Sequence, residues 1–301
     1  MTVSPMPSAD VDIDLGLVRR LLGEQMPDLA DRRLRMMANG WDNVMVRIGD
    51  DLVARLPRRA VAVRLLLHEQ RWLPDLAARL PLPIPVPVRV GRPGPGYPWP
   101  WSVVPYLPGG TAARVRPADH GQAAATLATF LAALHVPAPP AAPRNPVRGV
   151  PLARRAGSLT ENLERLGATV DGDLVTRMFR AAVTAAAWDR TPVWLHGDLH
   201  PANILIDGGR ISAVIDFGDL TAGDPATDLA VSWMLLPADS RGTFSQVYAA
   251  AIRHPVDEGL WIRARAWALV LSVAFLAHSA DNPQMAEIGR RTLDAVLDNE
   301  T

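Results

Sequence analysis

The segment from Val193 to Asp219, VWLHGDLHPANILIDGGRISAVIDFGD, constrains the fold of this chain more than any other. It contains two apolar runs, Ile204 to Ile206 and Ile211 to Ile215, joined by Asp-Gly-Gly. Short β-prone runs on either side of an Asp-Gly turn are typical of a β-hairpin. Because a hairpin places the residues before its first strand beside those after its second, we expect the polar residues that flank it to meet in space.

These flanking polar residues are His196, Asp198, Asn203 and Asp216. Phosphoryl transfer uses such a set: one carboxylate orients the attacking hydroxyl, while an amide oxygen and a second carboxylate hold Mg²⁺ on the nucleotide phosphates. Mg²⁺ prefers oxygen ligands and keeps several waters, so two protein ligands suffice. Taken alone, Asn203 would be interpreted as a structural turn residue. We expect His196 to orient the loop by hydrogen bonding.

Three short motifs, His196-Gly197-Asp198, Asn203 and Asp216-Phe217-Gly218, together resemble the catalytic and metal-binding loops of the aminoglycoside phosphotransferase family. That family shares the protein-kinase fold but has His-Gly-Asp where protein kinases have His-Arg-Asp. The resemblance implies an α+β, bilobal protein-kinase-like fold with a small β-rich N-terminal lobe and a larger, mainly helical C-terminal lobe. It also implies that Asp198 is the catalytic base, that Asn203 and Asp216 bind Mg²⁺, and that the phosphate donor is ATP or GTP.

The N-terminal part would then supply a cation for the nucleotide phosphates. Two β-prone runs, 44–48 and 52–56, flank a Gly-Asp-Asp turn and predict a hairpin, and a helix is expected from about Ala60 to Leu80. Kinases of the implied fold carry a lysine on the third strand, paired with a glutamate on the next helix. This chain has Arg55 there, with Glu69 in the helix.

A guanidinium can hold a carboxylate and contact phosphate, although it is larger than an ammonium group. We therefore place Arg55 and Glu69 at the nucleotide; a solvated strand arginine is the alternative. By the same resemblance, residues 39–43, which contain only one glycine, occupy the position of the loop that covers the phosphates.

Proline marks the expected division of the chain, because ten prolines fall between Pro81 and Pro108. Proline lacks the N–H that a central strand needs, so this region should be extended and edge-like. We predict a nucleotide-binding lobe at residues 1–107 and a catalytic and acceptor-binding lobe at 108–301. Helices are expected after Asp119 and at 173–187, and Ser158-Leu159-Thr160-Glu161 has the spacing of a capping box.

Composition restricts the other possible functions. Lys plus Arg and Asp plus Glu both number 31, so neither nucleic acid nor an anionic membrane has an electrostatic basis for binding. The chain has no cysteine, which excludes disulfides and permits a reducing cytoplasm. Acids precede the first apolar run where a signal peptide would need basic residues. The apolar run 267–277 is too short to span a bilayer and predicts a buried helix. We expect a cytoplasmic protein.

The acceptor is less constrained by the sequence. The acidic residues Asp219, Asp224 and Asp228 follow the hairpin. Asp219 and Asp224 would suit a cationic amino sugar, although for Asp224 we favour the role of a helix cap. The resemblance implies that Asp228 braces the catalytic loop. Only a few residues separate Gly218 from Pro225, so the platform on which protein kinases bind peptides is missing.

We therefore expect a small-molecule hydroxyl acceptor, first an aminoglycoside-like antibiotic. The alternatives are a macrolide, another antibiotic, or a metabolite such as homoserine, choline or a sugar. A nucleotide-binding pseudokinase is a remote alternative that rests on Arg55 and the glycine-poor loop. The sequence leaves the choice between ATP and GTP and the oligomeric state open.

Overall fold

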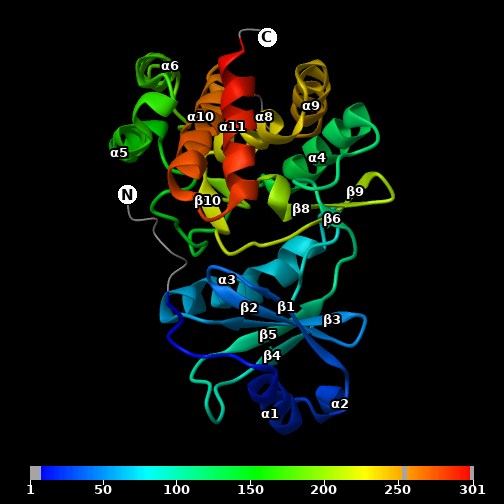
Figure 1. The fold of residues 1–301 in the computed structure, drawn as a ribbon. Coiled ribbons are helices and arrows are strands. Elements are labelled where there is room, and N and C mark those ends of the chain that lie inside the picture. The colour runs from blue at the N-terminus through cyan, green and yellow to red at the C-terminus, as the bar shows by residue number, and fades with distance from the viewer. Residues whose placement is uncertain (1–7, 253–255, 299–301) are drawn as a thin grey trace.

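The computed structural model describes residues 8–252 and 256–298. A β-sheet formed by the N-terminal third of the chain lies at one end of the molecule, and a helical C-terminal part lies at the other (Figure 1). The interpretation of the extreme N-terminus as lacking a signal peptide falls partly on residues 1–7, which lie outside the described residues. The sheet-plus-helix division expected from the sequence is confirmed.

The N-terminal lobe is built on a five-stranded antiparallel sheet with the strand order β1-β2-β3-β5-β4. Its strands are β1 (Leu34–Asn39), β2 (Asn43–Ile48), β3 (Leu52–Pro57), β4 (Arg89–Gly91) and β5 (Trp101–Pro105), and its helices are α1 (Leu15–Gln25), α2 (Pro27–Ala30) and α3 (Ala60–Ala77). The predicted hairpin is confirmed as β2–β3. Side chains of β2 alternate between buried and half-buried, as expected for a strand with one face on a core.

Two helices cover the two faces of this sheet (Figure 1). Helix α1, which is capped by Asp14, packs Val18, Leu21 and Leu22 with Ile48 and other residues of the sheet into one apolar cluster. Helix α3 lies on the side that faces the C-terminal lobe, and the end of α3 joins the core of that lobe. The N-terminal sheet is therefore anchored to the helical lobe by packing as well as by chain connection.

The C-terminal lobe consists of helices around two small sheets. Its α-helices are α4 (His120–Leu134), α5 (Ala156–Leu166), α6 (Gly172–Val183), α7 (Ala226–Leu229), α8 (Val231–Leu235), α9 (Ala238–Ala251), α10 (Leu260–His278) and α11 (Pro283–Leu297), with 3-10 turns η1 (Leu152–Arg155), η2 (Gly167–Thr169) and η3 (Pro201–Asn203). β7 (Val193–Leu195) pairs with β10 (Thr221–Gly223), and β8 (Ile204–Asp207) lies between β6 (Gly110–Thr111) and β9 (Arg210–Val214). The hairpin expected from the Asp-Gly-Gly turn is β8–β9.

Helix α10 forms the centre of this lobe. It is long and apolar enough to cross a membrane by length and composition, but 61% of its most apolar window is buried inside the protein. Residues such as Trp267, Leu271 and Val273 are fully or almost fully enclosed by neighbouring helices. The predicted buried helix is therefore observed, and it is longer than the apolar run 267–277 at both ends.

Two helix boundaries differ from the sequence prediction. The capping box at 158–161 is wrong, because η1 runs directly into α5, which already begins at Ala156. The Ser158 hydroxyl donates to the Arg155 carbonyl instead of capping a helix start. Helix α3 ends at Ala77, three residues earlier than expected. We propose that the lobes divide between residues 107 and 108, in the connection between β5 and β6.

Candidate active site

The β8–β9 hairpin places Asn203 beside the segment that carries Asp216. Ile204 pairs with Val214 in the hairpin register, and the Ile215 N–H donates to the Asn203 carbonyl over 2.9 Å. Asp216 follows at φ 63°, a left-handed conformation that few residues other than glycine adopt. This backbone geometry fixes the two predicted Mg²⁺ ligands relative to one another.

His196 connects the loop before β8, residues 196–203 (the HGD loop), to the end of β9. The Nδ1 atom of its buried imidazole accepts from the Asp198 N–H at 3.3 Å, which leaves the proton on Nε2. Nε2 then donates to the Ile215 carbonyl at 2.9 Å. One side chain thus joins the backbone of Asp198 to the residue before Asp216, which is the orienting role that the sequence predicts for His196.

A buried carboxylate holds the HGD loop from the other side. Asp228, which is fully enclosed, accepts from the backbone N–H groups of His196 at 2.7 Å and Gly197 at 2.9 Å. The ring of His135 lies 3.2 Å from the same carboxylate, and its other nitrogen is 2.8 Å from the hydroxyl of Tyr248. Burial raises the pKa of Tyr248, so this phenol stays protonated and available for the hydrogen bond. Asp228 therefore braces the loop.

Only glycine fits at position 197. Its φ is 86°, and a Cβ atom added there would lie 2.2 Å from the backbone carbonyl oxygen of Asp219. The close approach brings the HGD loop against the segment that follows the hairpin, and it explains why a small residue stands between His196 and Asp198.

Asp198 projects from this braced loop toward two cationic or titratable groups. Its carboxylate accepts from the Arg148 guanidinium at 2.8 Å and lies 3.3 Å from Nε2 of His200. Burial alone would raise the pKa of Asp198, but the charge of Arg148, followed by that of His200, outweighs burial and lowers the pKa well below its usual range. The carboxylate is thus ionised across the neutral range and can accept a hydrogen bond.

Asn203 and Asp216 line a cleft of about 600 Å³ between the two lobes. The amide of Asn203 donates through Nδ2 to the Asp198 carbonyl at 2.9 Å, which leaves its oxygen as the free acceptor. The Asp216 side chain is 60% exposed. An amide oxygen and an open carboxylate on one cleft wall are ligands that suit Mg²⁺, whose remaining positions water and phosphate would fill.

Arg55 and Glu69 lie at the same cleft, although Glu69 stands behind the arginine. The guanidinium of Arg55 is buried, donates to Glu69 at 2.8 Å and lies 3.6 Å from the Asp216 carboxylate. Burial opposes this charge, but the carboxylates of Glu69 and Asp216 raise the pKa of Arg55. The Nε atom of Arg55 is buried without a hydrogen-bond partner among the described residues. A phosphate oxygen in the cleft would supply the missing acceptor.

The other wall of the cleft comes from the loop between β1 and β2, residues 40–42 (the β1–β2 loop), and from the connector after β5. Trp41 is half exposed at the cleft, while the guanidinium of Arg58 donates to the Gly40 carbonyl at 3.2 Å. Tyr106 lies on the connector, and the guanidinium of Arg47, a β2 residue, lies 3.1 Å from the centre of its ring. The cleft is thus bounded by both lobes.

The acidic series after the hairpin divides into separate roles. Asp224 is buried in an ion pair with Arg263 at 2.7 Å, and it accepts from the Ala226 N–H at the start of α7. The half-buried Asp219 accepts from the side-chain amide of Asn145 at 2.7 Å. Burial, and next the charge of Asp198, raise the pKa of Asp219. Asp224 is therefore committed to the fold, and of the three acids only Asp219 adjoins Asp198.

Sequence reasoning missed Arg148, the cation on Asp198. It lies in the proline-rich segment 137–151, whose sequence has no periodicity to indicate which side chain points inward. The adjacent Gly149 has φ 65°, and a Cβ there would lie 2.7 Å from the side chain of Leu195. The close contact pins this segment against β7 and so delivers Arg148 to the loop. The sequence alone carries no signal for such a long-range contact.

The two lobes and the cleft between them define a kinase-like fold. The pattern of the phosphotransferase enzyme family (APH) matches residues 33–267, which include every side chain placed at the cleft above. The chain belongs to this phosphotransferase enzyme family. A search of curated protein sequences finds no significant match.

Solved structures share the fold. The GDP complex of wild-type aminoglycoside 2′-phosphotransferase-IIIa is 21% identical with a TM-score of 0.72, over 95% of this chain and 100% of that chain. Macrolide 2′-phosphotransferase MphH from Brachybacterium faecium is 25% identical with a TM-score of 0.63, over 95% and 100%. The streptomycin–ATP complex of APH(2″)-IIa is 16% identical with a TM-score of 0.58, over 94% and 97%.

Proposed function

We propose that this phosphotransferase transfers the γ-phosphate of ATP or GTP to a hydroxyl group of an antibiotic-like small molecule. One observation carries the proposal: the braced carboxylate of Asp198 stands beside a cleft whose wall presents Asn203, Asp216 and Arg55. The similar structures named with GDP or with ATP support a purine nucleotide as donor. Family membership supports phosphoryl transfer as the reaction.

In this proposal Asp198 accepts a hydrogen bond from the acceptor hydroxyl and aims its oxygen at the γ-phosphorus. The lowered pKa of Asp198 makes it a weak base, so the hydroxyl proton moves to it only as the new P–O bond forms. A loose transition state for phosphoryl transfer needs positioning more than early deprotonation. The carboxylate therefore acts chiefly by orientation, and the rigid HGD loop supplies that orientation.

Asn203 and Asp216 would hold Mg²⁺, which when bound neutralises charge on the nucleotide phosphates. Arg55 contributes a second positive charge from the N-terminal lobe, fixed by its ion pair with Glu69. Because guanidinium presents several N–H donors, Arg55 can keep Glu69 and contact phosphate at the same time. An arginine at this position is therefore compatible with catalysis, which weighs against the pseudokinase alternative.

Two acceptor classes remain candidates. An aminoglycoside-like acceptor is supported by similar structures named as aminoglycoside phosphotransferases. A neutral or weakly charged acceptor, such as a macrolide, is favoured by the charges beside Asp198. Arg148 pairs with Asp198, and Arg155 lies near enough to Arg148 for each charge to oppose the other. A polycationic amino sugar would meet these two arginines, whereas the carboxylate of Asp224 is bound internally.

The test is a panel of acceptors assayed with ATP and with GTP for nucleoside diphosphate release, with products identified by mass spectrometry. The panel contains aminoglycosides, macrolides, homoserine, choline and simple sugars. A phosphorylated product from any hydroxyl acceptor, absent with Asp198→Asn, supports the reaction, and the best substrate decides between the two acceptor classes. Mg²⁺-dependent nucleotide hydrolysis that survives in Asp216→Ala and Asp198→Asn, with no product from any acceptor, would overturn the proposal.

A further inference from the structure

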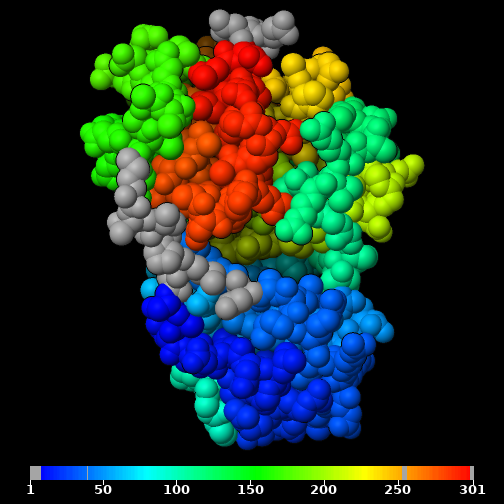
Figure 2. Space-filling model, viewed as in Figure 1, coloured from blue at the N-terminus to red at the C-terminus, as the bar shows by residue number. Residues whose placement is uncertain are grey.

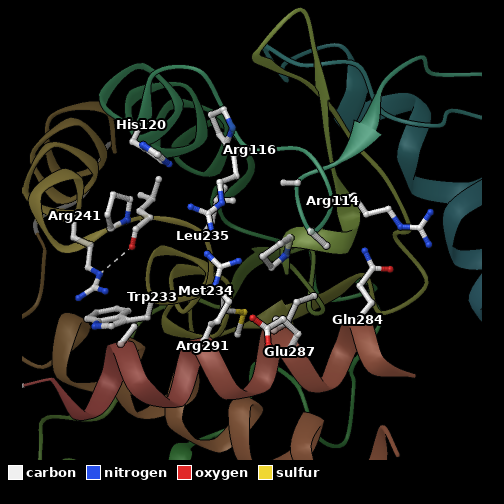
Figure 3. Close-up of a pocket in the computed structure, with 18 of the residues that line it drawn as sticks. Arg114, Arg116, His120, Trp233, Met234, Leu235, Arg241, Gln284, Glu287 and Arg291 are labelled. Carbon is white, nitrogen blue, oxygen red and sulfur yellow. Dashed lines mark hydrogen bonds between the residues drawn. The ribbon is translucent and has the colours of Figure 1, made fainter. Parts of the chain in front are cut away.

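A second cavity, of about 520 Å³, opens in the C-terminal lobe beside the nucleotide cleft, with which it shares Arg114. Its walls are the segment between β6 and α4, helix α8, the first turn of α9 and one side of α11 (Figure 3). In the space-filling view the surface is hollowed where α11, α4 and α9 meet (Figure 2). The turn η3, which ends the HGD loop, contributes to both cavities. Pro201 lines the second cavity, and Asn203 lines the cleft between the lobes where the nucleotide is proposed to bind.

The lining of this cavity is strongly cationic in a chain whose net charge is zero. Its charged side chains are Arg114, Arg116, Arg241, Arg291 and a single acid, Glu287, and His120 also lines it. The carboxylate of Glu287 is already bound by Arg290, with its oxygens 2.7 Å and 2.8 Å from the same guanidinium nitrogen. Little negative charge is therefore left to balance the arginines.

Of the four arginines that line this cavity, Arg241 donates to the Leu236 carbonyl at 3.3 Å, and the other three are exposed to solvent. Among the described residues, the side chains of Arg114, Arg116 and Arg291 form no hydrogen bond and no ion pair. Figure 3 shows the guanidinium groups of Arg116 and Arg291 pointing toward each other across the cavity, one from the segment before α4 and one from α11. Like charges that converge without a counter-charge repel, and an anion between them would relieve the repulsion.

The backbone adds to the positive potential. Helices α4, α9 and α11 have 15, 14 and 15 residues, and each begins at the cavity wall. Helix N-termini carry partial positive charge and attract anions. Asp119 and Asn282 already cap α4 and α11, whereas α9 follows Pro237, has no side-chain cap and carries Asp239 in its first turn. The helix termini therefore add less to the potential than the arginines do.

The remaining wall is apolar. Trp233, Leu235 and Ile288 line the cavity beside the arginines, and Arg241 lies above the Trp233 ring in Figure 3. A volume of about 520 Å³ exceeds the needs of an inorganic anion and leaves room for an organic part against this wall. Several converging guanidinium groups favour phosphate over a single carboxylate, because phosphate offers three oxygens and up to two charges.

We infer that this cavity, here named the arginine pocket, binds a small organic molecule that carries a phosphate group. Arg116 and Arg291 hold the phosphate, and Trp233 contacts the organic part. The inference does not depend on the acceptor or on the catalytic roles proposed above. Because Arg114 lines both the arginine pocket and the nucleotide cleft, the test must separate binding at the two places.

Isothermal titration with phenyl phosphate, using the full chain, tests the inference. The wild-type protein should bind phenyl phosphate, and the double variant Arg116→Gln/Arg291→Gln should bind it about tenfold more weakly or worse, since two charge-assisted contacts are lost. The matched control is Arg177→Gln/Arg180→Gln on the exposed face of α6, which removes the same charge without touching the pocket. The control should bind as wild type does, and because Arg116 and Arg291 line the arginine pocket but not the nucleotide cleft, this contrast separates binding at the two places.

A second readout does not depend on the arginine variants. Phenyl phosphate should change the tryptophan fluorescence of the wild-type protein, and Trp233→Phe should abolish that change while binding heat persists. The inference is overturned if the wild-type protein does not bind phenyl phosphate, or if benzoate binds equally tightly. It is also overturned if the control variant weakens binding as much as the pocket variant.

Discussion

Two loops face each other across the nucleotide cleft, and they are held in very different ways. The backbone of the HGD loop donates two N–H groups to the enclosed Asp228, and His196 ties it to the end of β9. The β1–β2 loop has half-exposed Trp41 at its tip and is held by a few contacts from Arg58 and Arg59. The difference indicates that the groups proposed to perform the chemistry are fixed, while the wall proposed to close over the nucleotide can adjust.

A physical reason underlies this contrast. Buried hydrogen bonds to a charged group are strong, and breaking them leaves unsatisfied donors in the interior. An ion pair that stays partly solvated, such as Arg59–Asp42 with side chains 19% and 31% exposed, is weaker and is screened by salt. A loop that must admit and release nucleotide is better served by the second kind of contact.

The largest effect is expected from Asp198→Asn, which keeps the shape of the HGD loop and removes its negative charge. The value of kcat should fall about 10²–10⁴-fold, because the acceptor hydroxyl loses the carboxylate that orients it. Nucleotide affinity, measured by titration, should stay close to that of the wild type. Undiminished turnover by this variant would show that Asp198 takes no part in the reaction. It would also contradict the statement that the rigid HGD loop holds the catalytic group.

The second effect concerns the brace itself. Asp228→Ala deprives two buried N–H groups of their acceptor, and each such loss costs about 1–3 kcal/mol. We expect the free energy of unfolding, measured in urea, to fall by about 3 kcal/mol, and kcat to fall as well. As a control, Asp207→Ala at the exposed end of β8 should change stability by less than about 0.5 kcal/mol. Equal stabilities for the two variants would show that the loop does not depend on Asp228.

Arg148→Met should change the pH dependence of kcat/KM. Burial raises the pKa of Asp198 and Arg148 lowers it, so removing Arg148 lets the pKa rise. The acidic limb of the profile should therefore move to higher pH, by about 1–2 units. His200, His196 and Asp219 also face Asp198, and they remain in the variant. Arg154→Met, at an exposed neighbouring position, is the control. An acidic limb that does not move would show that the protonation of Asp198 does not set it.

The smallest effect is expected in the β1–β2 loop. Arg59→Ala removes the half-buried ion pair with Asp42, and a partly solvated pair of this kind is worth about 1 kcal/mol. The KM for nucleotide should rise by at most about fivefold, and kcat should stay nearly unchanged. A loss of kcat as large as that of Asp198→Asn would mean that this loop is as fixed as the HGD loop, contrary to the comparison.

The sequence predicts the local structure of the candidate site better than its long-range contacts. The hairpin is a local structure with a recognisable turn, so the proximity of Asn203 and Asp216 follows from pattern alone. Arg55 and Glu69 could be proposed as a pair only through the resemblance to kinases, and their ion pair is present. The predicted start of α5 was wrong, because η1, a turn without a sequence signature of its own, begins the helical segment earlier.

The contacts that the sequence did not reveal are all long-range. Arg148 reaches Asp198 across 50 positions, and His135 reaches Asp228 across 93. Such contacts depend on how whole segments pack, and neither propensity nor periodicity encodes them. The ion pair that commits Asp224 to the fold is long-range as well. Asp224 is neutralised by Arg263, which lies 39 positions away.

Hydrogen exchange of backbone amides, followed with and without nucleotide, tests the central contrast most directly. The amides of His196 and Gly197, bonded to Asp228, should exchange only as slowly as the protein unfolds globally. The amide of Trp41, at the half-exposed tip of the β1–β2 loop, should exchange orders of magnitude faster and should slow when nucleotide binds. Similar exchange rates in the two loops, or a nucleotide effect confined to the HGD loop, would contradict the account.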